Sequence, residues 1–101
     1  MSVLMMLITR EKIRNENMIV EYTKLLENLP KGKIMSKMVN GKTYFYLYYR
    51  DKKKVVSKYI GKDEKKLVAI REKLTRRSQI EEIIKKLKNE KIQIKKMEAL
   101  L

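Results

Sequence analysis

Cysteine and histidine are both absent from this 101-residue chain. Without Cys, the chain has no disulfide, no thiolate metal site and no thiol nucleophile. Without His, it lacks the commonest general base and the commonest metal ligand. These absences exclude Ser/His and Cys/His nucleophilic catalysis and ordinary zinc sites. We therefore expect a protein that is not an enzyme and that needs neither a metal nor another cofactor.

Long apolar runs are also missing. The longest run covers residues 3–8 and has six residues, and no Lys or Arg precedes the run. A membrane-spanning helix needs about 20 apolar residues, and the apolar core of a signal peptide needs about 7–15. The sequence therefore predicts a cytoplasmic protein without a membrane partner.

Proline and glycine are scarce and fall in one part of the chain. Pro30, Gly32, Gly41 and Gly61 are the only such residues, so the two flanking segments contain none. Because Gly and Pro interrupt regular structure, this distribution predicts a helical front, a β-structured centre and a helical tail.

What the chain does have is positive charge. Lys and Arg total 26 against 12 Asp and Glu, which gives a formal net charge of +14 and a pI near 10.0. A charge so far from zero opposes compaction, and a pI above about 9 is typical of nucleic-acid-binding domains. We expect nucleic acid as the partner, DNA rather than RNA. The alternative is a lysine-rich surface that merely follows genome composition.

The front segment contains an amphipathic pattern over residues 18–29, and Pro30 prevents its continuation. Asn15-Glu16-Asn17 is a weak helix-forming stretch, so residues 1–17 are interpreted as an arm or a weak helix. The apolar positions that recur at spacings of three and four are Met18, Tyr22, Leu25, Leu26 and Leu29.

The centre predicts a three-stranded antiparallel β-meander over residues 33–60. Asn40-Gly41 separates two β-prone runs, and this pair favours a type I′ turn because both positions accept a positive φ. Residues 42–50 are rich in aromatic and β-branched side chains, which favour strands. Asp51-Lys52 supplies the second turn, before a third strand that ends at Gly61.

The tail, residues 63–101, is predicted to be helical, with Asp63 as the N-cap. Apolar residues recur at intervals of seven in a heptad-like stripe, and their phase slips around residues 75–78, which predicts two helices or one bent helix. The stripe would pack on the front helix or form a homodimer. Its members are Ile80, Leu87, Ile94 and Leu101. The sequence thus predicts one α+β domain over residues 18–101.

The middle strand carries the candidate binding surface. Alternation places Tyr44, Tyr46 and Tyr48 on one face and Phe45 and Leu47 on the other. If a helix covers only the second face, the tyrosines can stack on bases while neighbouring lysines neutralise phosphates. In the alternative, helices cover both faces and the tyrosines belong to the core. The predicted nucleic-acid-binding residues are Lys37, Lys42, Tyr44, Tyr46, Tyr48, Arg50, Lys53, Lys54, Lys58, Arg76 and Arg77.

Two resemblances bear on these residues. The runs Leu29-Pro30-Lys31-Gly32, residues 41–50 and residues 57–62 resemble an uncharacterised family of short prokaryotic proteins with the pattern LPKG, GKxYYYLxYR and SKYIGK. The resemblance implies a protein of phages or other mobile elements and implies no established activity.

The second resemblance is architectural. A three-stranded meander followed by a helix is similar to the arm-type DNA-binding domain of tyrosine integrases, which lays its sheet in the major groove. The integrase catalytic domain has no counterpart here, and fold alone does not define function.

A rival hypothesis is a protein-interaction module with an acidic partner, such as an inhibitor of a CRISPR-type host defence complex. An enzyme acting through adjacent carboxylates, such as Glu81-Glu82, is disfavoured because neighbours on a helix point in different directions.

Overall fold

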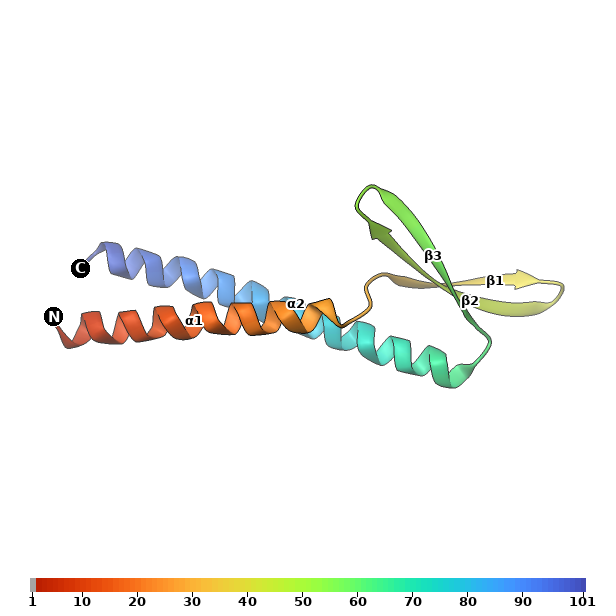
Figure 1. Cartoon of the computed structure of the whole chain (residues 1–101), viewed down its shortest axis with the longest axis horizontal. Helices are drawn as coiled ribbons and strands as arrows, with labels where there is room; N and C mark the ends of the chain where they lie inside the picture. Colours follow the sequence, from red (N-terminus) through yellow and green to blue (C-terminus); the bar gives the residue numbers. More distant parts are fainter. Residues whose placement is uncertain (1) are drawn as a thin grey trace. The chain divides into compact units, whose positions relative to one another are not determined.

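The chain is an α+β protein in the order helix, three-stranded antiparallel sheet, helix (Figure 1). A computed structural model describes residues 2–101. This architecture confirms the predicted fold class. The elements are α1 (Val3–Glu27), β1 (Lys33–Val39), β2 (Lys42–Asp51), β3 (Lys54–Gly61) and α2 (Glu64–Ala99).

The chain forms two compact units. The helical unit contains the N-terminal segment up to Asn28 together with Ser78–Leu101, and the sheet unit contains Leu29–Arg77. The α+β domain predicted for residues 18–101 is therefore divided between the two. In residues 2–101, no helix is both long enough and apolar enough to cross a membrane.

Helix α1 begins much earlier than predicted. It starts at Val3, where the Ser2 hydroxyl accepts a hydrogen bond from the Met5 backbone N–H at 3.1 Å, and it ends at Glu27 rather than residue 29. The sequence predicted an arm or weak helix over residues 1–17 and a helix beginning at residue 18. This was wrong, because α1 continues through residue 18 without a boundary. Packing on a second helix outweighs the poor helix propensity of Asn15 and its neighbours.

Helix α2 is one continuous helix of 36 residues, not two helices. Asp63 is its N-cap as predicted, because its carboxylate accepts a hydrogen bond from the Lys65 backbone N–H at 2.9 Å. No Gly or Pro interrupts residues 75–78. The slip in apolar phase has another cause: Leu67 faces the sheet, whereas Ile80 belongs to the helical unit.

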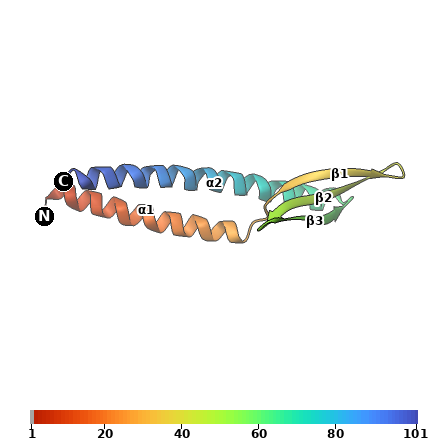
Figure 2. The same cartoon turned by 90° about the horizontal axis from the view of Figure 1, so that it is seen from above.

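The helical unit is an antiparallel pair in which the start of α1 lies beside the end of α2 (Figures 1 and 2). Arg14 and Glu90 form an ion pair at 2.7 Å, and the Asn15 side-chain N–H donates to the Leu87 carbonyl oxygen at 2.8 Å. The heptad-like stripe therefore packs on α1. Its buried members are Ile80, Leu87 and Ile94, opposite Ile8 of α1.

Asn15 is a buried polar residue in the apolar seam, by which we mean the packed interface between α1 and α2. It is 1% exposed, and its Oδ1 has no hydrogen-bond partner among the described residues. A half-satisfied amide in a helical seam costs stability, and it is known to fix register in coiled coils.

The sheet follows the predicted meander, with strand order β1-β2-β3. Asn40 and Gly41 have φ values of 51° and 77°, as a two-residue type I′ turn requires, and Val39 pairs with Lys42 across it. The second turn consists of Lys52 and Lys53, one residue later than the predicted Asp51-Lys52; it pairs Asp51 with Lys54 and places Lys52 at φ 57°. Both hairpins are therefore tight, which fixes the register of all three strands.

Gly32 fixes the entry to β1. Its φ is 121°, and a Cβ atom there would lie 2.2 Å from the Tyr48 carbonyl oxygen and 2.8 Å from the Tyr49 Cβ. Only Gly fits such a close approach in this backbone conformation. The glycine that ends the Leu-Pro-Lys-Gly run thus has a structural reason in this chain.

Candidate nucleic-acid interface

The two faces of the sheet differ in what covers them. On one face, Leu47 and Ile60 form a buried cluster with Leu67 from the first turns of α2. The partly buried side chains packed around this cluster are Ile34, Phe45, Tyr49, Ile70 and Leu74. Within the sheet unit, α2 therefore covers the Phe45/Leu47 face, as predicted for a sheet that is covered on one side.

The other face carries four tyrosines, and we call it the tyrosine face. Tyr44, Tyr46 and Tyr48 project from β2. Tyr59 of β3 lies on the same face because it pairs with Tyr46 of β2. The three β2 tyrosines are half-buried, whereas Tyr59 is 58% exposed. Tyr59 is therefore the ring of this face most open to a ligand.

The four rings contact one another in tilted arrangements, and the pair Tyr46–Tyr59 is edge to face. Tyr46 is central: its ring centroid lies 5.4 Å from that of Tyr59, at 61°, and 6.4 Å from that of Tyr48, at 51°. Tyr44 contacts Tyr59 at 6.3 Å. Tilted arrangements of this kind are preferred by aromatic pairs and hold the rings in place.

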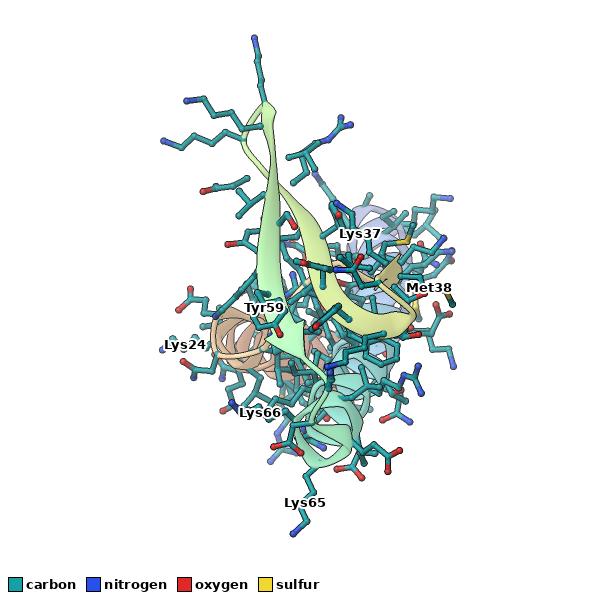
Figure 3. All side chains as sticks on the ribbon, turned by 90° about the vertical axis from the view of Figure 1, so that its right-hand side faces the viewer. Lys24, Lys37, Met38, Tyr59, Lys65 and Lys66 are labelled. Carbon is teal, nitrogen blue, oxygen red and sulfur yellow. The ribbon has the colours of Figure 1, made fainter. Side chains whose placement is uncertain are left out.

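Two lysines lie over these rings. The Lys37 ammonium is 5.3 Å from the Tyr46 centroid and 5.8 Å from that of Tyr48, and the Lys62 ammonium is 4.9 Å from that of Tyr44. These are cation–π distances. Figure 3 labels Lys37 on β1 and Tyr59 on β3 among the side chains around the sheet.

Lys37 and Tyr48 also influence each other's ionisation. A hydrogen bond with the Tyr48 hydroxyl raises the pKa of Lys37 above its usual value. The same bond, followed by a second one with Ser57, lowers the pKa of Tyr48. The raised pKa of Lys37 favours its ammonium form, so this side chain keeps its positive charge beside the tyrosines.

The structure brings together six of the predicted contact residues. Strand alternation and cross-strand pairing place them on the tyrosine face, joined by Lys33, which pairs with Tyr48. The six are Lys37, Lys42, Tyr44, Tyr46, Tyr48 and Arg50.

The other predicted residues lie elsewhere. Lys58 pairs with Leu47 and Lys54 with Asp51, so both belong to the opposite face, and grouping them with the tyrosines was wrong. Lys53 is in the exposed turn between β2 and β3. Arg76 is exposed on α2, and Arg77 donates a hydrogen bond to the Leu29 carbonyl oxygen at 3.1 Å, which gives it a structural role.

Sequence reasoning missed Tyr59 and Lys62. The signal for Tyr59 was available, because a two-residue turn after Asp51 implies that Tyr59 pairs with Tyr46. Lys62 depends on a bulge: Phe45 pairs with Gly61 and Tyr46 with Tyr59, so Ile60 is an extra residue on β3. Nothing in the local sequence predicts that bulge.

The two units differ strongly in net charge. The sheet unit holds 16 of the 26 basic residues and 4 of the 12 acidic ones, a net charge of +12, which leaves +2 for the helical unit. The only acidic residue in the three strands is Asp51, on the face opposite the tyrosines. The tyrosine face therefore carries cations and no carboxylate.

The described part of the chain contains no cluster of three or more acidic side chains able to hold a metal ion. A basic, aromatic sheet face with cations at its centre and edges instead has the groups that bind phosphates and stack on rings.

Fold and site together define a small α+β protein with an antiparallel helix pair and a basic, tyrosine-rich β-meander. The chain belongs to the DUF6788 family, described as a domain of unknown function, whose sequence model matches residues 8–69. The match covers most of α1, the whole sheet and the start of α2. No curated protein and no solved structure matches the chain significantly.

Proposed function

We propose that this chain is a non-catalytic nucleic-acid-binding protein whose tyrosine face contacts the ligand. The observation that carries the proposal is the composition of that face, which has four tyrosines and five flanking cations without a carboxylate. The cations are Lys33, Lys37, Lys42, Arg50 and Lys62. A net charge of +12 on the sheet unit supports attraction of a polyanion to this part of the chain.

The two residue types have different tasks. Lysine and arginine side chains contact phosphates and so set affinity and orientation. Tyr59, the most exposed ring, lies against a sugar of a duplex, or stacks on a base where the strands are unpaired. The half-buried rings of Tyr44 and Tyr46 hold Tyr59 in place, so little side-chain freedom is lost when the ligand binds.

The shape of the sheet favours duplex DNA. β1 pairs with β2 only as far as Tyr48, so residues 49–56 continue as a two-stranded ribbon. A two-stranded ribbon fits the major groove of B-DNA, whereas the deep, narrow major groove of an RNA duplex excludes one. Arg50, Lys52, Lys53 and Lys54 give the ribbon end its positive charge.

A matched pair of charge-removing variants tests which face binds. Lys37→Gln removes a cation from the tyrosine face, and Lys58→Gln removes one from the opposite face of the same sheet. Fluorescence anisotropy with a labelled 20-base-pair duplex at fixed low salt should show about tenfold or greater weakening for Lys37→Gln. Lys58→Gln should bind nearly as wild type. Equal effects would contradict the assignment of the face.

A second pair tests the ring. Against a labelled single strand, whose bases are free to stack, Tyr59→Ala should weaken binding by about 1–3 kcal/mol, whereas Tyr59→Phe should retain most of the affinity because the ring remains. Thermal unfolding of both variants serves as the control, since an exposed ring contributes little to folding. If Tyr59→Ala binds as wild type, the tyrosines act in the fold alone.

A further inference from the structure

The helical unit has an apolar groove that its own two helices leave open. Leu4, Leu7 and Ile8 of α1 and Ile94 and Met97 of α2 line a groove of about 380 Å³. Leu4, Leu7 and Met97 are each at least half exposed, although each lies beside the buried seam of the helix pair. Such a cluster on a small protein is a feature of contact surfaces.

The charges of the groove set it apart from the rest of the molecule. Its only ionised side chains are Glu11, Arg14 and Glu90, which sum to −1 in a chain of +14. Two copies of the chain repel each other through their sheet units at +12, but their helical units carry only +2 each. The groove is therefore a place where two copies can meet at little electrostatic cost.

The order of residues along α1 makes this surface complementary to itself. Leu7, Glu11, Arg14 and Met18 recur at spacings of four, three and four, so they form one stripe on the helix. The stripe reads apolar, acidic, basic, apolar. When a second stripe runs in the opposite direction about a two-fold axis, Leu7 faces Met18, and Glu11 faces Arg14.

We propose that the chain forms a homodimer in which the two helical units pack through this groove as an antiparallel four-helix bundle. The seven-residue stripe of α2 cannot serve instead, because Ile80 and Leu87 are already buried against α1. The inference concerns the helical unit alone and does not rest on the proposed nucleic-acid function.

The first test measures mass. Sedimentation of the full-length chain should give twice the monomer mass of 12.2 kDa at micromolar concentration and fall toward the monomer mass on dilution. Leu7→Glu should give a monomer with unchanged helical content. Val20→Glu is the matched control, because Val20 is a similarly exposed apolar residue of α1 outside the groove, and this variant should stay dimeric. A monomeric wild-type chain, or equal effects of the two variants, would overturn the proposal.

A mixing experiment tests the two-fold pairing itself. Glu11→Arg alone places two guanidinium groups opposite each other at each facing pair, and Arg14→Glu alone places two carboxylates there, so each variant should be monomeric. Mixed in equal amounts, they should form a heterodimer, because every facing pair is then of opposite sign. Circular dichroism of each variant checks that the helices persist. Two dimeric single variants, or a mixture that stays monomeric, would refute the antiparallel arrangement.

Discussion

Replacing Gly32 with Ala should be among the most destabilising single-methyl changes in this chain. At φ 121° an L-residue is strained, which costs on the order of 1–3 kcal/mol. The added Cβ would also lie 2.2 Å from the Tyr48 carbonyl oxygen, so the backbone must move, at a further cost of about 1–3 kcal/mol. We expect a total loss of about 4 kcal/mol in the free energy of unfolding, a large share of the stability of a small domain.

Gly41→Ala is the internal control for this prediction. Gly41 also has a positive φ, 77°, but a Cβ there would meet no atom within 4 Å. It should therefore lose only the conformational term, about 1–2 kcal/mol. Urea unfolding followed by circular dichroism measures both variants. If Gly32→Ala costs no more than Gly41→Ala, the close approach to β2 does not constrain this position and our account of the Leu-Pro-Lys-Gly run is wrong.

Two further predictions concern the helical seam. Asn15→Leu should raise the free energy of unfolding by about 1–3 kcal/mol, because it removes a buried amide oxygen without a partner; an unchanged or lower urea midpoint would show that the amide is satisfied in solution. Leu87→Asp should place an uncompensated charge in the seam and lower amide hydrogen-exchange protection across α1 and the second half of α2. Protection that stays at the wild-type level in both segments would mean that the two helices do not pack through Leu87.

The sheet was predictable because its signals are local. Asn40-Gly41 determines the first hairpin, and the aromatic run of β2 determines the middle strand, so the predicted and observed strands agree to within a residue or two. Asp63 likewise marks the start of α2. Turn chemistry and capping act over a few residues, and a single sequence displays them directly.

The errors arose where partners distant in sequence decide the outcome. The segment around Asn15 is helical because it packs on Leu87, 72 residues away. The phase slip before Ile80 reflects a change of packing partner rather than a break in the helix. Lys58, a predicted contact residue, lies on the face opposite the tyrosines because the register set by the second turn pairs it with Leu47.

The salt dependence of binding to duplex DNA tests the central claim most directly. If the five cations of the tyrosine face contact phosphates, each displaces a condensed counterion, and log K should fall with log[salt] at a slope of about −4.5, or more steeply if the lysines of the ribbon end also contact phosphates. The slope should become shallower by about 0.9 in Lys37→Gln and stay unchanged in Lys58→Gln. A slope near zero, or no binding of duplex or single-stranded DNA or RNA even at low salt, would contradict nucleic-acid binding by this chain.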